Sequence, residues 1–229
     1  MRKVFFVTGT DTGVGKSYVA AGLLQMALAE GLSTAALKPV AAGCDMTPDG
    51  LRNDDALLLQ KYCSPSLLYE QVNPVALPLA VAPHIAAAQA GQRLEVERLL
   101  GFCRAVLMQR ADLTVIEGAG GWRVPLNARH TLAEIPRRLQ IPVIMVVGIR
   151  LGCINHALLT AEAIRADGLE LAGWVANCVD ARMPCREENI ATLVSMLDSP
   201  LLATIPWQQD IERSSCAPLF DPAQILGSD

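Results

Sequence analysis

The stretch Gly9-Thr10-Asp11-Thr12-Gly13-Val14-Gly15-Lys16-Ser17 directly follows the apolar run Val4-Phe5-Phe6-Val7. It predicts a loop that binds nucleotide phosphates, because glycines let the backbone curl around the phosphates and the first amides of a helix point toward them. The Lys16 ammonium would reach the β and γ phosphates, and the Ser17 hydroxyl would bind Mg²⁺. The usual pattern has four residues between its glycines, whereas five lie between Gly9 and Gly15, so this loop is a close variant.

The composition favours an α/β protein. The chain has 229 residues, of which 52% are apolar and only 4% aromatic, as expected where aliphatic side chains pack between a parallel sheet and its helices. We therefore expect residues 1–229 to form one domain, with a single doubly wound, mainly parallel sheet like that of P-loop NTPases. The net charge of −4 and the lack of a basic run argue against a nucleic-acid partner.

Cysteine usage and hydropathy indicate a cytoplasmic protein. The seven cysteines are scattered and form no CxxC pair, as expected for reduced thiols. The first residues lead straight into a strand, with too short an apolar stretch for a signal peptide. Prolines break the apolar run at 75–90, and a membrane span needs about 20 apolar residues. We therefore expect no membrane partner.

Strand-like runs alternate with helix-like stretches along the chain. Short β-branched runs that are apolar on both faces predict strands at Val4–Thr8, Thr34–Pro39, Leu113–Glu117, Val143–Val147, Leu171–Asn177 and Leu201–Ile205. Longer periodic stretches predict helices at Lys16–Glu30, Asp54–Tyr62, Leu94–Arg110, Leu132–Leu139, Asn155–Asp167 and Arg186–Leu197.

Two of these strands end in charged residues, and ligands of a doubly wound sheet gather at strand carboxyl ends. Lys38 is either a surface lysine with a buried stem or a second cation that neutralises charge on a transferred phosphate. Glu117, which precedes a glycine-rich turn, fits either a Mg²⁺ site or a solvated acid.

Three further positions leave alternatives open. Asp55 fits a second metal carboxylate or a helix N-cap, and Asp54 competes for the capping role. The stretch 152–156 fits a carboxylate-binding helix start or an ordinary one. Asn177 ends another strand, and its amide carries the donor and acceptor that adenine needs, although this observation alone is weak.

A combination of short motifs is more specific than the phosphate loop. These motifs are Gly9-Thr10-Asp11-Thr12, Lys38-Pro39-Val40, Glu117-Gly118-Ala119-Gly120-Gly121, Gly152-Cys153-Ile154-Asn155-His156 and Gly173-Trp174-Val175-Ala176-Asn177. Together they resemble the dethiobiotin synthetase family, and the resemblance runs over nearly the whole chain.

The resemblance implies an ATP- and Mg²⁺-dependent carboxylation and ring closure. In this reaction 7,8-diaminopelargonate and carbon dioxide form a carbamate, which attacks the γ-phosphorus of ATP to give a carbamic–phosphoric anhydride. The second amine then closes the ring of dethiobiotin and expels phosphate. Such chemistry requires charge neutralisation and alignment more than a protein nucleophile. The family also implies a homodimer, in which the helix start at 152–155 reaches the neighbouring subunit's site.

The resemblance assigns roles to individual residues as well. Lys16 and Lys38 would be the catalytic cations, and Ser17, Asp55 and Glu117 would bind Mg²⁺. The residues implied for the diamine are Lys38, Ala42, Gly152, Cys153, Ile154 and Asn155. Those implied for the nucleotide are Thr12, Gly13, Val14, Gly15, Lys16, Ser17, Tyr18, Asp55, Glu117, Gly118, Ala119, Gly120, Asn177, Cys178, Pro206, Trp207 and Gln208.

Two positions depart from the family's usual residues. Ser17 stands where many relatives have threonine, and either hydroxyl can bind Mg²⁺. Ala42 stands where relatives often have a serine that contacts substrate. One lost neutral hydrogen bond costs about 0.5–1.5 kcal/mol, so we expect a higher KM with activity retained. The change also leaves room for a paralogue with a different substrate preference.

Three rival interpretations are disfavoured. Partner-regulated switch ATPases of the same superfamily carry an extra lysine early in the loop, where this chain has Asp11. Cobyrinate-type amidotransferases add a glutaminase segment for which the sequence has no length to spare. A nucleotide-binding protein without activity would not require Lys16, Lys38 and Glu117 together.

Overall fold

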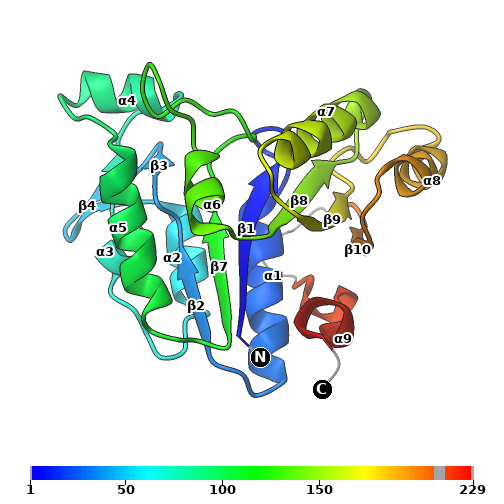
Figure 1. The fold of residues 1–229 in the computed structure, drawn as a ribbon, viewed down its shortest axis with the longest axis horizontal. Helices are drawn as coiled ribbons and strands as arrows, with labels where there is room; N and C mark the ends of the chain where they lie inside the picture. The colour runs from blue at the N-terminus through cyan, green and yellow to red at the C-terminus, as the bar shows by residue number, and fades with distance from the viewer. Residues whose placement is uncertain (1, 209–214, 228–229) are drawn as a thin grey trace.

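The computed structural model describes residues 2–208 and 215–227. Its main sheet has six parallel strands in the order β10-β9-β8-β1-β7-β2, with helices on both faces (Figure 1). This arrangement confirms the predicted doubly wound, mainly parallel sheet. The strands are β1 (Lys3–Gly9), β2 (Thr34–Leu37), β7 (Leu113–Glu117), β8 (Val143–Gly148), β9 (Leu171–Asn177) and β10 (Leu201–Ile205).

The central strands form because their side chains are apolar on both faces. Every residue of β7 and of β8 is buried. Strand β1 pairs with β7 on one side, where Val7 lies opposite Glu117, and with β8 on the other, where Gly9 lies opposite Val146. The loops that follow β1, β7 and β8 therefore emerge next to one another at the carboxyl edge of the sheet.

The helices form two layers. Figure 1 shows α1 and α2 behind the sheet and α5, α6 and α7 in front of it. Burial of each large aliphatic or aromatic side chain between these layers contributes about 1.5–3 kcal/mol. The helices are α1 (Lys16–Ala29), α2 (Asp54–Gln60), α3 (Tyr69–Val72), α4 (Pro83–Gln89), α5 (Val96–Leu107), α6 (Glu134–Leu139), α7 (Cys153–Ala166), α8 (Arg186–Met196) and α9 (Pro222–Leu226), with a 3₁₀ helix η2 (Ala217–Leu219).

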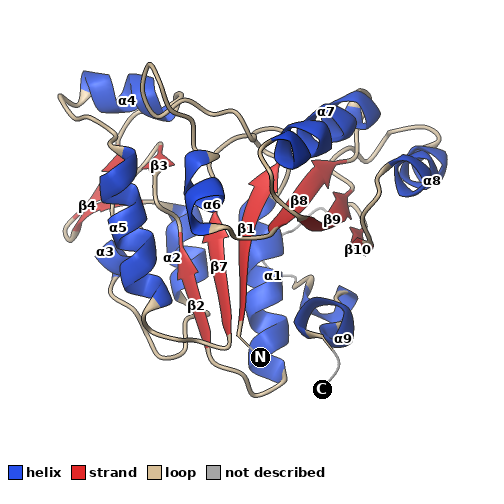
Figure 2. Cartoon of the chain, viewed as in Figure 1, coloured by secondary structure: helices blue, strands red, loops and turns tan. Residues whose placement is uncertain are grey.

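Two small sheets lie outside the main one. Strand β3 (Ala41–Ala42) pairs in parallel with β6 (Ala76–Leu77), and β4 (Asp45–Thr47) pairs antiparallel with β5 (Gly50–Arg52). Figure 2 shows β3 and β4 on the β2 side of the main sheet. The sequence did not predict these short strands.

Some predicted boundaries were wrong by one to three residues. The second strand ends at Leu37 instead of Pro39, because the amide of Lys38 turns to the carbonyl of Val72 and proline has no amide to donate. Helix α7 begins at Cys153, two residues before the predicted start. Among the described residues, no helix is long and apolar enough to cross a membrane. All seven cysteines lie in the described ranges and are free thiols.

Candidate functional site

The loop between β1 and α1 depends on glycines and on a brace from β9. Gly13 and Gly15 have φ angles of 73° and 86°, in the left-handed region that side chains other than glycine rarely adopt. A Cβ on Gly15 would lie 2.2 Å from Nδ2 of Asn177. That same Nδ2 donates a hydrogen bond to the carbonyl of Val14 at 2.8 Å. The last residue of β9 therefore holds the loop in shape.

Lys16 lies folded over this loop. Its side chain is buried, and Nζ donates to the backbone carbonyl of Asp11 at 3.1 Å. Burial lowers the pKa of Lys16, although the negative charge of Glu117 opposes this effect. The ammonium group is thus partly dehydrated and close to the loop amides, where an anion would interact with it strongly.

Four side chains from different elements meet beside the loop. The carboxylate oxygen Oε1 of Glu117 accepts hydrogen bonds from Ser17 Oγ at 2.8 Å and from Lys38 Nζ at 2.8 Å. Lys38 Nζ also donates to Oδ2 of Asp55 at 2.5 Å. The Ser17–Lys38–Asp55–Glu117 cluster therefore brings together four residues that the sequence singled out.

Opposite charges set the ionisation of this cluster. Burial alone would lower the pKa of Lys38, but the charges and hydrogen bonds of Glu117 and Asp55 raise it above its ordinary value. Burial would raise the pKa of Asp55, yet Lys38 lowers it. The lysine is therefore held as a cation and Asp55 as an anion.

Glu117 keeps one oxygen out of this network. The side chain is fully buried, and Oε2 has no hydrogen-bond partner among the described residues. Carboxylate and hydroxyl oxygens are the donors that Mg²⁺ prefers, so Glu117, Asp55 and Ser17 have suitable chemistry for that ion. No group of three His, Cys, Asp or Glu side chains in the described ranges could hold a metal by itself.

A cavity of about 180 Å³ lies at the ends of β9 and β10. Tyr18 from α1 closes one side, where its hydroxyl donates to Oε1 of Gln208 at 3.1 Å. Gly13 of the phosphate loop and Asn177, which holds that loop, both line the cavity, so the cavity adjoins the loop. The structure thus gathers, in the lining of one cavity, seven residues predicted for the nucleotide: Gly13, Tyr18, Asn177, Cys178, Pro206, Trp207 and Gln208.

The glycine-rich turn after β7 passes close to the phosphate loop. A Cβ on Gly121 would lie 3.6 Å from the carbonyl of Gly9, and one on Gly120 would lie 3.5 Å from Thr12 Oγ1. A Cβ on Gly118 would meet the ring of Phe6 at 3.1 Å. Gly120 and Gly121 therefore lie within van der Waals distance of the loop, whereas Gly118 lies against Phe6 of β1.

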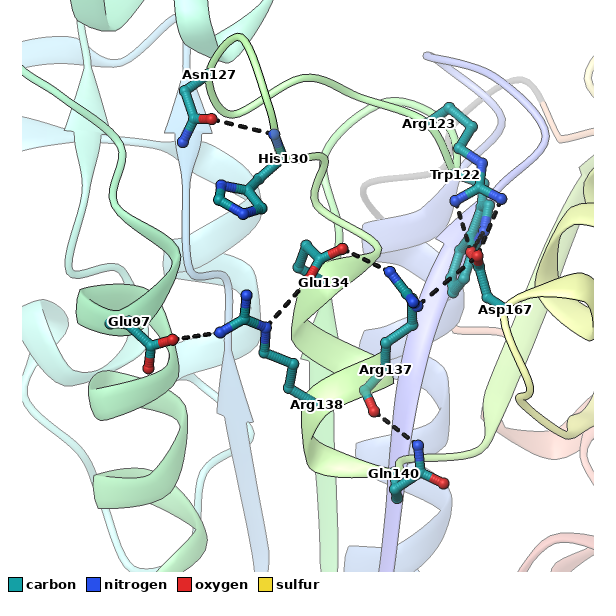
Figure 3. A network of polar contacts seen from close by, with 10 residues as sticks. All are labelled: Glu97, Trp122, Arg123, Asn127, His130, Glu134, Arg137, Arg138, Gln140 and Asp167. Carbon is teal, nitrogen blue, oxygen red and sulfur yellow. Dashed lines mark hydrogen bonds and ion pairs between the residues drawn. The ribbon is translucent and has the colours of Figure 1, made fainter.

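A polar network anchors this turn to α7. The Trp122 ring packs edge-on against Phe6 with 6.1 Å between centroids, and its Nε1 donates to Oδ2 of Asp167 at 2.8 Å. In Figure 3 the side chains of Trp122, Arg123 and Arg137 all point toward Asp167, the C-cap residue of α7. The network therefore connects the segment after Glu117 with the helix whose start was predicted to bind substrate.

The predicted substrate residues are less closely grouped. Gly152, with a φ of 94°, precedes the first turn of α7, which contains the buried Cys153 together with Ile154 and Asn155. Ala42 lies in β3, opposite Leu77. Among the described residues, no hydrogen bond or ion pair joins this helix start to Lys38 or Ala42.

Sequence reasoning missed three residues around the site. The Arg150 guanidinium forms an ion pair with the Asp11 carboxylate of the loop, and the rule that polar residues at strand ends are candidates could have found it. Asn73 donates to the backbone carbonyl of Lys38 at 2.7 Å, and the Tyr69 hydroxyl donates to Asn73 at 3.1 Å. No sequence spacing indicated the last two.

Comparison with known proteins gives a consistent picture. A family model described as "AAA domain" matches residues 3–215. The ATP-dependent dethiobiotin synthetase BioD of Cellvibrio japonicus is 60% identical over 205 residues, which cover 90% of this chain and 90% of that protein. The BioD proteins of Pseudomonas paraeruginosa and Marinobacter nauticus are 57% and 53% identical, each over more than nine tenths of both chains.

Solved structures match at the level of fold. The septum site-determining protein MinD of Pyrococcus horikoshii, complexed with Mg-ADP, has a TM-score of 0.59 at 20% identity over 99% of this chain and 95% of that one. A ParA family ATPase of Chlorobium tepidum has a TM-score of 0.58 at 13% identity, over 100% and 95%. The receptor FtsY of Elizabethkingia anophelis has a TM-score of 0.55 at 18% identity, but this chain spans only 64% of its length.

The similarity to these structures shows the P-loop NTPase fold. At such low sequence identity it says nothing more specific about function. The sequence relatives are far more similar and are covered almost from end to end. The chain belongs to the family of ATP-dependent dethiobiotin synthetases.

Proposed function

We propose that this protein converts 7,8-diaminopelargonate, carbon dioxide and ATP into dethiobiotin, ADP and phosphate. The observation that carries the proposal is the Ser17–Lys38–Asp55–Glu117 cluster beside the phosphate loop. It holds a buried cation next to the place where the γ-phosphate of a bound nucleotide would lie. Family membership supports the choice of substrates.

The proposed chemistry requires three steps. One amine of the substrate attacks carbon dioxide and loses a proton, which gives a carbamate. A carbamate oxygen then attacks the γ-phosphorus, and the bond between that phosphorus and ADP breaks. The second amine attacks the carbonyl carbon of the resulting anhydride, loses a proton and expels phosphate as the ring closes.

The two lysines serve this sequence through charge. Lys16 lies over the loop that would hold the β and γ phosphates. Lys38 lies in the Ser17–Lys38–Asp55–Glu117 cluster beside that loop, where it donates a hydrogen bond to Glu117. Cations held in place before the reaction stabilise the charge that develops on the carbamate and on the transferring phosphoryl group. Alignment of the two reactants supplies the rest, so the site requires no protein nucleophile.

Ser17, Asp55 and Glu117 would hold Mg²⁺ in this proposal. The unpartnered Oε2 of buried Glu117 supports the assignment, since such an oxygen otherwise carries the full cost of its burial. Bound Mg²⁺ would neutralise phosphate charge during the transfer. The bound phosphates and water would complete its set of oxygen ligands.

The cavity beside Asn177 would take the adenine base. Nδ2 of Asn177 already donates one hydrogen bond to the Val14 carbonyl, and Oδ1 of Asn177 is available to accept a hydrogen bond from the adenine amino group. The backbone of 206–208 and the Tyr18 ring would enclose the base. We also propose, from the family resemblance, that the protein is a cytoplasmic homodimer, with the start of α7 binding the substrate carboxylate in the partner's site.

A product assay tests the proposal. Protein with MgATP, bicarbonate and 7,8-diaminopelargonate should give ADP, phosphate and the cyclic urea dethiobiotin, identified by mass spectrometry. ATP hydrolysis should depend on the diamine, because the carbamate is the phosphoryl acceptor. Hydrolysis that is independent of diamine, with no cyclic product, would favour a switch ATPase instead.

A further inference from the structure

We propose that Tyr69 and Asn73 are positioning residues for the reaction: a buried chain of hydrogen bonds through their side chains joins the backbone of Lys38 to the start of α2 and so fixes where Lys38 and Asp55 meet. Among the described residues, neither side chain forms a hydrogen bond or ion pair with the side chain of Lys38 or Asp55. The inference rests on the proposed function, since it gives Lys38 and Asp55 their chemical roles.

The backbone of Lys38 lacks the support that a strand would give it. Strand β2 ends at Leu37, so Lys38 lies beyond the main sheet. Its amide instead donates to the carbonyl of Val72 at 2.7 Å, and its carbonyl accepts from Nδ2 of Asn73 at 2.7 Å. Asn73 Nδ2 also donates to the carbonyl of Val75 at 3.3 Å. Both polar backbone groups of Lys38 are therefore held by the segment at the end of α3.

Tyr69 extends this support to α2. Its hydroxyl donates to Oδ1 of Asn73 at 3.1 Å and accepts from the backbone amide of Asn53 at 2.8 Å. Asn53 is the N-cap of α2, where its side chain accepts from the amide of Ala56 at 3.3 Å. Asp55 lies in the first turn of that helix. One hydroxyl thus connects the support of Lys38 with the helix start that carries its partner.

The side chains of Tyr69 and Asn73 are buried, and each of their polar atoms has a hydrogen-bond partner. Tyr69 is 6% exposed and Asn73 is 3% exposed. The Arg52 guanidinium lies 4.1 Å from the centre of the Tyr69 ring and covers it from solvent. Buried networks in which every member has its partners restrict side chains to one arrangement. This explains why two polar side chains occupy sites among apolar ones.

Precise support matters here because Lys38 has a long, flexible side chain. Nζ has to reach Asp55 at 2.5 Å and Glu117 at 2.8 Å at the same time. Misplacement of a catalytic group by about 1 Å can cost about a hundredfold in rate. Loss of a partner behind a metal ligand typically costs about 10–100-fold in metal affinity or activity.

The variant Tyr69→Phe tests the proposal because it removes only the hydroxyl. We expect kcat for dethiobiotin formation to fall about tenfold, while KM for ATP changes less than about twofold, because the loop and the base cavity keep their contacts. The second readout is the increase in ADP affinity that Mg²⁺ produces, measured by calorimetry with and without Mg²⁺. We expect this increase to be smaller in Tyr69→Phe than in wild type. The matched control is Tyr62→Phe, just beyond the other end of α2, whose hydroxyl has no hydrogen bond among the described residues.

The inference is overturned if Tyr69→Phe equals the control in both kcat and the Mg²⁺-dependent gain. Should Tyr69→Phe fail to fold, Asn73→Ser replaces it, because the shorter side chain cannot span to the Lys38 carbonyl, and the same outcomes apply. If wild-type protein forms no dethiobiotin, the proposed function fails, whereas the calorimetric comparison still decides the positioning role.

Discussion

Lys38 is the residue whose removal should change the molecule most. Its ammonium lies between two carboxylates, and one of them, Glu117, is fully buried. A buried ion pair adds little net stability, but loss of one partner leaves the other charge without compensation. The chemical role proposed for Lys38 is therefore coupled to a structural one.

We expect Lys38→Met to lower the free energy of unfolding by about 3–5 kcal/mol, because the Glu117 carboxylate loses its counterion. Urea denaturation followed by circular dichroism measures the change. Lys61→Met, on an exposed lysine just after α2, is the control and should stay within about 0.5 kcal/mol of wild type. Equal stability of the two variants would show that the Glu117 charge is compensated in another way.

For Lys16→Ala we expect turnover to fall by at least about a hundredfold, the loss typical for one group that stabilises transition-state charge. The fold should be retained, since among the described residues Nζ of Lys16 donates a hydrogen bond only to the Asp11 carbonyl. Steady-state rates of dethiobiotin formation, with thermal melting as the check on folding, give the comparison. A loss of turnover of only severalfold would mean that Lys16 does not stabilise the transition state and that the loop is only a structural turn.

At the scale of elements, the starts of β2 and β7 are joined by Asp112. Its Oδ2 accepts from the amide of Ser33 at 2.9 Å and from the Ser33 hydroxyl at 2.5 Å. The Ser33 hydroxyl in turn accepts from the amide of Asp112 at 3.0 Å. Hydrogen bonds from the Ser33 side chain and backbone lower the pKa of Asp112 below its ordinary value of 3.8. These hydrogen bonds align the edge strand β2, which Lys38 directly follows.

The lowered pKa gives a pH dependence with a definite sign. The Asp112 carboxylate stabilises the fold above its unfolded pKa, near 3.8, and this contribution disappears as pH falls through the lower pKa of the folded state. We expect Asp112→Asn to melt at a lower temperature than wild type at neutral pH, and the difference to shrink below about pH 3.8. Calorimetric melting across this range measures it, with Asp49→Asn as a control in the exposed turn between β4 and β5. A difference that does not vary with pH would contradict the assignment.

Local patterns predicted the main elements well. The run Val4-Phe5-Phe6-Val7, the glycines after it and the stretch from Lys16 form a strand, a turn and a helix, as predicted. The prediction succeeded because all of these residues are close together in the sequence. The strands β3 and β6 were missed because each has two residues, and pairing across 35 positions leaves no periodicity to detect. For the same reason Asn73, which supports Lys38 from a distant loop, had no signal in the sequence.

At the scale of the whole molecule, the candidate site depends on strand order. Ser17 and Glu117 are 100 positions apart, yet their side chains meet because β1 pairs with β7. The rule that polar residues gather at carboxyl ends of parallel strands predicted Lys38 and Glu117, and the structure places both in one cluster. The rule could not group Gly152–Asn155 with Ala42, because no hydrogen bond or ion pair among the described residues joins them.

That separation motivates a test of the proposed homodimer. If the start of α7 serves the neighbouring subunit, a Lys16→Ala subunit and an Asn155→Ala subunit each spoil a different part of the site. Mixing the two inactive proteins should restore about a quarter of wild-type activity, because half of the dimers are mixed and each of these has one intact site.

Subunit exchange has to be shown first, for example with differently tagged chains. A mixture that exchanges subunits and stays inactive would place all substrate contacts within one chain. Wild-type protein carried through the same exchange procedure is the control for losses during mixing.

Gly15 carries a consequence for how this sequence can change over time. Its φ of 86° strains any residue with a Cβ, and that Cβ would also lie 2.2 Å from the amide of Asn177. A shorter side chain at position 177 would relieve the collision but would leave the backbone strain and release the Val14 carbonyl. No single compensating substitution can therefore rescue a change at Gly15, so position 15 accepts glycine alone.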